Sequence, residues 1–194
     1  MLIKRKSGGA SRSKLQVLTA GLASGTLDRR TFLTRSGLAV GGLAAVGSIP
    51  LGSIKKAEAV AAREPDSLVL AADTVVAVGR RILPKVEDEE TLRACMKLLS
   101  GRRHRVMTGV ALAAPGQAVR TRLVQTMIAM KSLSPQEIDF YASHGEWRGK
   151  AGGYALQGYG EVYVRHIAGS YSNVVGLPLA ETRNLLKAAG YDIA

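Results

Sequence analysis

The stretch Ser67-Leu-Val-Leu-Ala-Ala-Asp73-Thr74-Val-Val-Ala-Val-Gly-Arg-Arg-Ile-Leu-Pro-Lys85 organises the predicted fold. Residues 68–72 form an unbroken apolar run that is too short for a helix, which is typical of a strand covered on both faces. Asp73 is predicted to close this strand. The segments on either side of Gly79 favour β-structure and predict a hairpin. The hairpin would return Lys85 toward Asp73, at the end of a sheet where open α/β proteins bind ligands.

Asp73 is the main candidate for chemistry in this stretch. A carboxylate at the end of a buried strand is costly to desolvate unless it binds a cation, accepts hydrogen bonds or handles a proton. From the residues alone, this interpretation stands beside a simpler one, in which Asp73 only caps the following turn.

The charge of the chain is uneven. The 194 residues carry a net charge of +12, which would suit a nucleic-acid partner. Residues 1–59, however, hold ten Lys and Arg against two Asp and Glu, whereas residues 60–194 hold seventeen against thirteen. Because the basic excess lies at the N-terminus and only 5% of the residues are aromatic, the sequence predicts no nucleic-acid partner.

Several chemistries lack the residues that they need. Cys95 is the only cysteine, which excludes an internal disulfide and disfavours an iron–sulfur redox subunit. His104, His144 and His166 fall in separate predicted elements without metal-ligand spacing, so we expect structural or exposed positions for them. The chain contains no G-x-S-x-G elbow, P-loop or dinucleotide fingerprint, which leaves serine-nucleophile chemistry without support.

The first 59 residues have the order of an export signal. A basic, Gly/Ser-rich segment leads to Arg29-Arg30 and Phe32-Leu33, and then to a mild apolar run and Ala57-Glu58-Ala59. This order predicts a twin-arginine leader over residues 1–59, largely disordered or helical, ahead of a domain over residues 60–194. The apolar run is short for a stable membrane span. The alternative is a loosely packed N-terminal helix.

Beyond Lys85 the sequence predicts alternating helices and strands. The acidic residues 87–90 start a helix that ends at Gly101, and residues 106–114 and 119–130 form a strand hairpin. Ser134 and Glu137 form the capping box of a second helix. A strand over residues 162–167 and a last helix after Pro178, with Leu179, Leu185 and Leu186 on its buried side, follow. The fold class is therefore α/β.

A set of small and polar residues could surround a phosphorylated ligand. Lysines neutralise phosphate charge, glycines let backbone amides approach, and a carboxylate can hold Mg²⁺ or activate water. For each residue alone a structural role is the simpler interpretation: a bulge for the glycine pair, a strand edge for the glutamine, and a turn for the Ser/Asn segment. The set comprises Asp73, Thr74, Lys85, Lys150, Gly152, Gly153, Gln157 and residues 170–173.

Together these motifs resemble the Maf family over about residues 55–194. The motifs, in family order, are Ala72-Asp73-Thr74-Val75-Val76, Ile82-Leu83-Pro84-Lys85, Leu99-Ser100-Gly101-Arg102, Thr108-Gly109-Val110, Leu133-Ser134, Lys150-Ala-Gly-Gly-Tyr-Ala-Leu-Gln-Gly158 and Gly169-Ser-Tyr-Ser-Asn-Val-Val-Gly-Leu-Pro-Leu179. The resemblance implies a mixed sheet with flanking helices, similar to that of inosine triphosphatases. It also implies a nucleoside triphosphate pyrophosphatase that cleaves between the α- and β-phosphates.

The resemblance assigns roles to five residues. Asp73 would be the catalytic proton acceptor and a ligand of a divalent metal, Mg²⁺ or Mn²⁺. Lys85 would lie on the phosphates, and Lys150 completes the substrate-binding set. Thr74 and Gln157 match the positions that set base preference, and the pairs Asp-Thr and Gln-Gly are similar to the branch that acts on dTTP and UTP.

The chain departs from the family pattern in three places. Pro84-Lys85-Val86 stands where the family has Gly-Lys-Pro, and Met127 stands where it usually has arginine. Nothing in residues 1–59 matches the family's opening Leu-Ala-Ser-x-Ser-Pro-Arg-Arg segment. We therefore expect a domain that lacks the family's first strand and is joined to the leader, through a gene fusion or an error in sequence assembly. An exported, inactive remnant or binding domain is the alternative function.

Location and partners follow from the same two features. The family resemblance predicts a cytoplasmic enzyme, whereas use of the leader would place the protein in the periplasm. The expected partners are a nucleoside triphosphate, the Tat export machinery if the leader is used, and a second copy of the chain if the protein is a homodimer.

Overall fold

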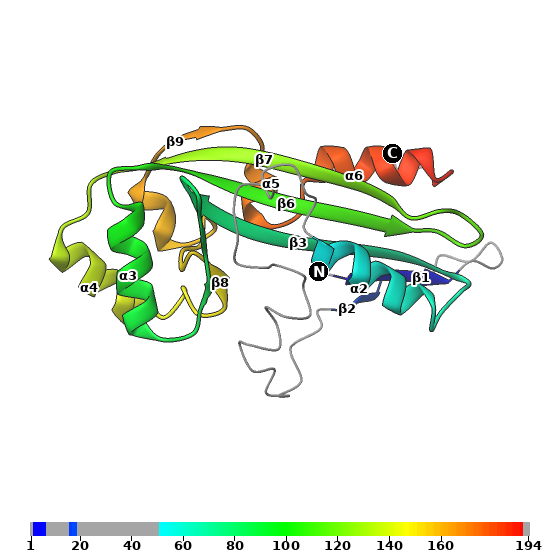
Figure 1. The fold of residues 1–194 in the computed structure, drawn as a ribbon, viewed down its shortest axis with the longest axis horizontal. Helices are drawn as coiled ribbons and strands as arrows, with labels where there is room; N and C mark the ends of the chain where they lie inside the picture. Colours follow the sequence, from blue (N-terminus) through cyan, green and yellow to red (C-terminus); the bar gives the residue numbers. More distant parts are fainter. Residues whose placement is uncertain (1, 7–15, 19–50, 192–194) are drawn as a thin grey trace. The chain divides into compact units, whose positions relative to one another are not determined.

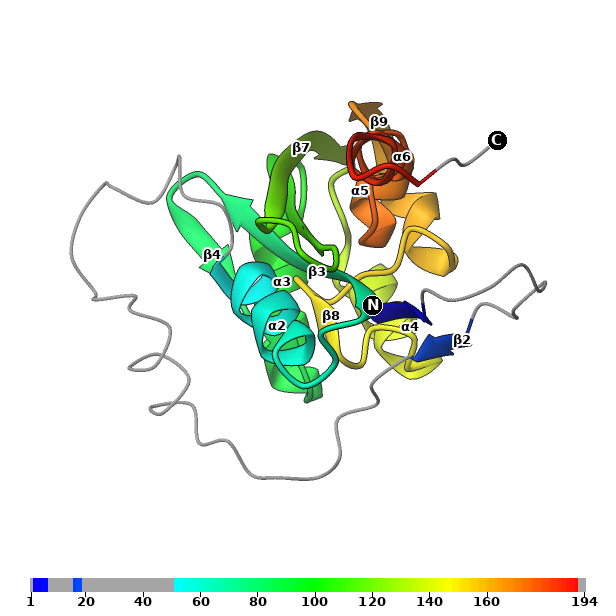
Figure 2. The ribbon, with the colours of Figure 1, turned by 90° about the vertical axis from the view of Figure 1, so that its right-hand side faces the viewer.

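The computed structural model of the chain describes residues 2–6, 16–18 and 51–191 (Figures 1 and 2). Within these ranges, a seven-stranded sheet has the order β2-β1-β3-β6-β7-β9, with β4 paired to β3, and β5 and β8 form a separate two-stranded sheet. Along the chain, helix α2 lies between β2 and β3, α3 between β5 and β6, and α4 between β7 and β8, while α5 and α6 follow β9. This is the α/β class that the sequence predicts.

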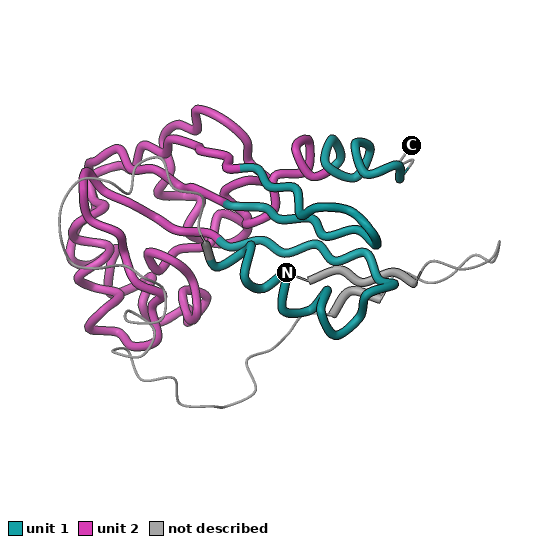
Figure 3. The backbone as a smooth tube through the Cα atoms, turned by 45° about the vertical axis from the view of Figure 1, so that its right-hand side comes forward, with its two compact units in different colours: residues 1–73, 109–122, 183–194 teal, residues 74–108, 123–182 magenta. Residues whose placement is uncertain are grey.

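The chain divides into two compact units, shown in different colours in Figure 3. Unit 1 comprises residues 1–73, 109–122 and 183–194, and unit 2 comprises residues 74–108 and 123–182. Strands β3 (Ser67–Val78), β6 (Arg103–Ala113) and β7 (Arg120–Met130) contribute residues to both units. In β3 the change of unit falls between Asp73 and Thr74.

Strand β3 is longer than the sequence predicts. The apolar run from Leu68 to Ala72 is buried, as expected of a strand covered on both faces. The prediction that Asp73 closes the strand is wrong, because β3 continues to Val78. The valines that follow Asp73 favour extended backbone and carry the strand onward. Asp73 is thus an in-strand residue, which also excludes the turn-cap interpretation.

The predicted hairpin after β3 is confirmed. Val78 pairs with Arg81, and Val76 pairs with Leu83, in the antiparallel ladder between β3 and β4 (Arg81–Leu83). Gly79 begins the turn with φ +55, a conformation that glycine adopts without steric cost. The chain then enters β5 (Lys85–Val86).

In unit 1, helix α2 (Leu51–Ala61) packs on the sheet. Ala57 is fully buried and packs with four residues of β3 and β6: Val69, Ala71, Ala111 and Ala113. Figure 2 shows α2 running beside β3. The helix crosses the predicted boundary between residues 59 and 60. Because these side chains are small, the cluster buries little apolar surface per residue.

The predicted leader contains two strands. Residues 2–6 form β1 (Leu2–Lys6) and residues 16–18 form β2 (Gln16–Leu18). The leader is predicted to be largely disordered or helical, and these two short segments are instead strands. β1 pairs antiparallel to β3, with Leu2 opposite Ala71, because the backbone edge of β3 offers N–H and C=O groups that another strand can satisfy. The Arg29-Arg30 motif and most of the apolar run lie outside the described residues.

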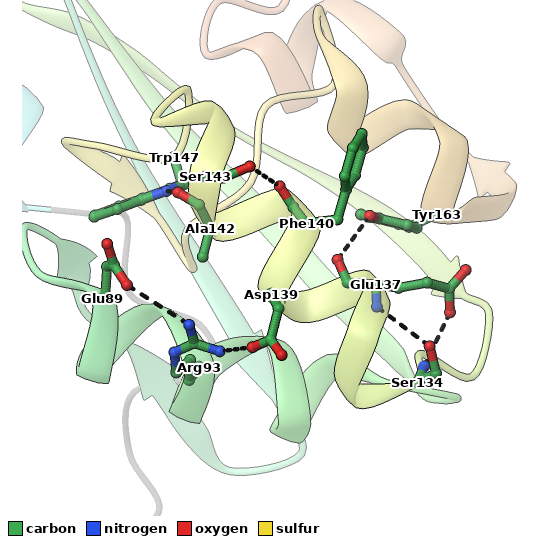
Figure 4. A network of polar contacts seen from close by, with 10 residues as sticks. All are labelled: Glu89, Arg93, Ser134, Glu137, Asp139, Phe140, Ala142, Ser143, Trp147 and Tyr163. Atoms are coloured by element: carbon green, nitrogen blue, oxygen red, sulfur yellow. Dashed lines mark hydrogen bonds and ion pairs between the residues drawn. The ribbon is translucent and has the colours of Figure 1, made fainter.

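Unit 2 contains an apolar core with several large side chains. Helices α3 (Glu89–Leu99) and α4 (Pro135–His144) lie side by side, and Arg93 of α3 contacts Glu89 and Asp139 (Figure 4). Beneath them, the apolar cluster includes large side chains that are fully buried: Trp147, Tyr141, Leu92, Met96 and Leu99. The predicted capping box is confirmed, since Ser134 accepts from the Glu137 N–H and the Glu137 carboxylate accepts from the Ser134 N–H.

The C-terminal part of unit 2 differs from prediction in two details. The predicted strand over residues 162–167 starts as a 3-10 helix, η1 (Tyr159–Tyr163), and becomes strand β9 (Val164–Ala168) only afterwards. The Glu146 carboxylate accepts from the backbone N–H groups of Tyr159 and Gly160, which stabilises this tight turn. β8 (Lys150–Ala151) and α5 (Tyr171–Val175) are short.

The last helix, α6 (Leu179–Ala188), begins in unit 2 and ends in unit 1. Leu185 is buried on it as predicted, but Leu179 is 61% exposed. The prediction for Leu179 is wrong because the first turn of a helix need not face the core that its later turns contact. Among the described helices, none is long and apolar enough to cross a membrane.

Candidate active site

Asp73 lies in unit 1, against the first turns of α2. Its side chain is 25% exposed, and its Oδ1 atom lies 3.3 Å from the Nζ atom of Lys56. A Cβ atom added at Gly52 would lie 2.6 Å from Oδ2, so the helix backbone comes directly against the second oxygen. A side chain at position 52 would therefore displace the carboxylate, and glycine permits the close approach.

Lys56 is a candidate functional residue that the sequence analysis missed. It lies 17 positions from Asp73 in the chain, and its segment was assigned to the end of the leader. The lysine side chain is 57% exposed, and ion pairs in contact with water contribute about 0–1 kcal/mol to stability. Lys56 is therefore of interest for its position, because its ammonium group lies beside a candidate proton acceptor.

Thr74, the next residue along β3, belongs to unit 2. Its Oγ1 atom lies 2.9 Å from the Oγ1 atom of Thr108, and the Thr108 hydroxyl donates to the main-chain oxygen of Asn173 at 3.0 Å. Thr108 and Asn173 are fully buried, whereas Thr74 is partly exposed. Of these three residues, Thr74 is thus the one with exposed surface.

Asn173 fixes the buried end of this chain. Its side-chain amide donates to the main-chain oxygen of Val106 at 3.1 Å and to the Thr126 hydroxyl at 3.0 Å. Its own N–H donates to the Ser170 hydroxyl, which caps α5. Residues 170–173, predicted either to touch phosphate or to form a turn, here connect β6, β7 and α5 through buried hydrogen bonds.

The two predicted lysines lie on neighbouring strands of unit 2. Lys85 pairs opposite Ala151, and Val86 pairs opposite Lys150, in the antiparallel ladder of β5 and β8. Because side chains alternate between the faces of a strand pair, the two lysines belong to opposite faces. Both are exposed. The pairing of β5 with β8 brings the two lysines to neighbouring positions, but it does not place them on one face.

The glycine pair after β8 is required by packing. Gly152 and Gly153 have φ +71 and φ +76. A Cβ atom on Gly153 would lie 2.9 Å from side-chain atoms of both Leu92 and Val86, and one on Gly152 would lie 3.1 Å from Val76. The sequence left a bulge and a phosphate contact open for these glycines. Their contacts in the structure are with apolar side chains.

Gln157 is exposed at the end of a loop that is anchored from inside. Tyr154 is buried and lies 2.7 Å, hydroxyl to Nε2, from His104, and the Tyr141 hydroxyl accepts from the Ala155 N–H at 3.2 Å. After the loop, the Glu146 carboxylate holds the start of η1. Gln157 thus follows a segment that is held by hydrogen bonds, while Gln157 itself is exposed and lies outside the core.

The histidines occupy structural or exposed positions, as predicted: His104 is buried, whereas His144 and His166 are exposed. Burial lowers the pKa of His104 to about 4, and its Nδ1 atom has no hydrogen-bond partner within the described structure. Burial also raises the pKa of its neighbour Tyr154. His144 stacks on Tyr159, and His166 lies on β9. A neutral His104 therefore acts as a hydrogen-bonding core residue at neutral pH.

Asp73 is the predicted ligand of a divalent metal. Within residues 2–6, 16–18 and 51–191, no group of three or more His, Cys, Asp or Glu side chains could hold a metal ion. Asp73 presents a single carboxylate, and its Oδ1 atom already faces the ammonium of Lys56. The divalent metal therefore stays a prediction.

Comparison with known proteins gives a consistent family. The family model described as "Maf-like protein" matches residues 51–189. A dTTP/UTP pyrophosphatase of Zymomonas mobilis is 53% identical over 153 residues, covering 76% of each chain. The dTTP/UTP pyrophosphatase of Caulobacter vibrioides is 58% identical over 139 residues, covering 72% of each. That of Paramagnetospirillum magneticum is 60% identical over 136 residues, covering 70% of this chain and 72% of its own.

With the family model matching from residue 51 to residue 189, the chain belongs to the Maf family.

Proposed function

We propose that this chain is a nucleoside triphosphate pyrophosphatase that hydrolyses dTTP and UTP to the monophosphate and pyrophosphate. The observation that carries the proposal is the similarity to three proteins named dTTP/UTP pyrophosphatase, at 53–60% identity over 70–76% of this chain. The Maf match covers residues 51–189 and therefore every predicted site residue.

The reaction needs a proton acceptor and positive charge near the leaving group. The water oxygen bonds to the α-phosphorus, the bond from this phosphorus to the bridging oxygen breaks, and pyrophosphate leaves. Asp73 takes the proton of the attacking water. It suits this role because its carboxylate is partly exposed and held in one orientation between Lys56 and Gly52.

The remaining residues bind the substrate. Lys85 is exposed and supplies a cation for the phosphates, which carry the charge that develops in the reaction. Lys150, on the other face of the strand pair, is a second substrate-binding residue. Thr74 and Gln157 recognise the base, because a hydroxyl oxygen can accept a hydrogen bond, and an amide can both donate and accept, at a pyrimidine edge.

The proposal is tested with the purified full chain. Incubation with dTTP or UTP should release pyrophosphate, and Asp73→Asn should lower kcat by about 100-fold or more, the usual contribution of a general base. Asp139→Asn is the matched control, because Asp139 is exposed and pairs with Arg93 on the surface of unit 2. Release at the wild-type rate by Asp73→Asn would contradict the role of Asp73, and no release by the wild type would contradict the function.

A divalent metal belongs to the proposal through the family resemblance. Activity should disappear in EDTA and return on addition of Mg²⁺ or Mn²⁺. Full activity after exhaustive chelation would remove the metal from the proposal.

We place the enzyme in the cytoplasm, where nucleoside triphosphates are made and used. The Arg29-Arg30 motif supports the alternative of export to the periplasm through the Tat machinery. Cell fractionation separates the two, because export would recover a shortened chain in the periplasm. A second copy of the chain is the further proposed partner, and the mass in solution distinguishes monomer from homodimer.

A further inference from the structure

In unit 2, the hydrogen bonds that join Thr74, Thr108 and Asn173 constrain where the hydroxyl protons of the two threonines lie. Thr108 has one hydroxyl proton, and its Oγ1 atom donates to the main-chain oxygen of Asn173 at 3.0 Å. A carbonyl oxygen can only accept, so this bond has a fixed direction. The proton of Thr108 is therefore committed to Asn173.

The contact between the two threonines then has a direction too. Thr74 and Thr108 lie 2.9 Å apart, Oγ1 to Oγ1, and one of the two must donate. Because the Thr108 proton is already used, Thr74 is the donor. The Thr74 oxygen keeps a lone pair for any ligand and has no proton left to offer.

The carbonyl that sets this order cannot turn away. The oxygen of Asn173 also accepts from the Gly176 N–H at 3.1 Å. The Asn173 side chain is fully buried and is held by Val106 and Thr126. The acceptor at the inner end of the chain is therefore fixed by three separate contacts.

We propose that Thr108 is a positioning residue that makes the Thr74 hydroxyl a hydrogen-bond acceptor, and that this selects pyrimidines with a ring N–H. The inference rests on the proposed function, in which Thr74 meets the base. Uracil and thymine carry a donor at ring position N3, whereas cytosine carries an acceptor there. An acceptor facing an acceptor leaves both groups unpaired, which sites built on hydrogen bonds reject strongly.

The discrimination is measured as the ratio of kcat/KM for UTP to that for CTP. The wild type should favour UTP. Thr108→Val keeps the shape of the side chain but removes its hydroxyl, so the Thr74 hydroxyl can rotate and donate to cytosine. We expect the ratio to fall by about 10-fold or more, the usual consequence of freeing one such contact. Thr108→Ser retains the hydroxyl and should retain the ratio.

Thr182→Val is the matched structural control. Thr182 is a buried threonine of unit 2 whose hydroxyl has no hydrogen-bond partner among the described residues. This variant should keep the ratio. An equal fall of the ratio in Thr182→Val would show a general effect of replacing a buried threonine and overturn the proposal.

A second variant keeps the test decisive if Thr108→Val does not fold. Thr74→Val removes the acceptor itself at a partly exposed position and should lower the ratio mainly by slowing UTP hydrolysis. An unchanged ratio in Thr74→Val or in folded Thr108→Val overturns the inference, as does a wild type that hydrolyses UTP and CTP equally. A wild type that hydrolyses no pyrimidine triphosphate contradicts the proposed function instead.

Discussion

The two units hold their candidate residues in different ways. In unit 1, Asp73 has an ion pair with Lys56, whose side chain is 57% exposed, over a cluster of alanines and valines. In unit 2, Thr74 ends a chain of buried hydrogen bonds beside a core that includes Trp147. The difference matches the proposed tasks. A proton acceptor must exchange its proton with water, whereas base recognition needs donors and acceptors whose directions are fixed in a dry interior.

The largest expected difference between the units concerns stability. The free energy of unfolding should depend on pH through His104, which lies in unit 2. Burial lowers the pKa of this imidazole from 6.5 to about 4. Between these values the unfolded chain binds a proton that the folded chain does not, so the free energy of unfolding falls as the pH drops from about 6.5 to about 4. A shift of this size corresponds to about 3 kcal/mol.

The measurement is urea unfolding at several pH values between 4 and 7.5. His104→Gln removes the titrating group while keeping a polar group toward Tyr154, and it should flatten the curve in this window. His166→Gln is the control, since His166 is exposed on β9 and its replacement should leave the pH dependence in place. A wild-type curve that is flat between pH 4 and 6.5 would contradict the buried neutral state of His104.

A glycine-to-alanine pair compares backbone cost with packing cost. Gly116 in unit 1 and Gly153 in unit 2 have similar φ angles, +67 and +76, so alanine is strained by about 1 kcal/mol at either position. At Gly116 nothing lies within 4 Å of the added Cβ, whereas at Gly153 two side chains lie at 2.9 Å. Overpacking of this kind costs about 1–3 kcal/mol more.

Thermal and urea unfolding of Gly153→Ala and Gly116→Ala provide the comparison. Equal losses in the two variants would mean that Leu92 and Val86 give way without cost, and that the core of unit 2 is softer than its burial indicates. A larger loss of stability in Gly153→Ala would show that glycine is needed at this position for close packing against Leu92 and Val86.

Local features of this chain were predictable, and contacts between distant residues were not. The capping box of Ser134 and Glu137 and the hairpin at Gly79 depend on residues a few positions apart, so their signal lies in a short stretch. The bond between Thr74 and Thr108 joins positions 34 apart, and that from Thr108 to Asn173 joins positions 65 apart. The periodicity of the sequence carries no signal for such distant pairs. The directions of their hydrogen bonds can therefore be determined only from the folded structure.

The same reason explains the errors at the candidate site. Asp73 was predicted to end its strand because a carboxylate rarely continues a buried apolar run. The structure accommodates it in β3 by placing α2 and Lys56 beside it, from a segment that the sequence assigned to a leader. The roles of Gly152 and Gly153 were left open because a positive φ and an apolar neighbour give no signal distinct from that of a phosphate-binding loop.

The smallest expected effect concerns the ion pair of unit 1. Lys56→Met removes the ammonium from Asp73 and keeps much of the aliphatic stem, so the free energy of unfolding should fall by less than about 1 kcal/mol. Added salt should shrink the difference from wild type, because salt screens exposed charges. Lys131→Met in unit 2 is the comparison, since Lys131 pairs with Glu137 and also lies over the Tyr163 ring. We expect the larger loss there. A larger and salt-insensitive loss in Lys56→Met would mean that Asp73 is held by a desolvated pair, and the contrast between a partly exposed acid in unit 1 and a buried network in unit 2 would have to be abandoned.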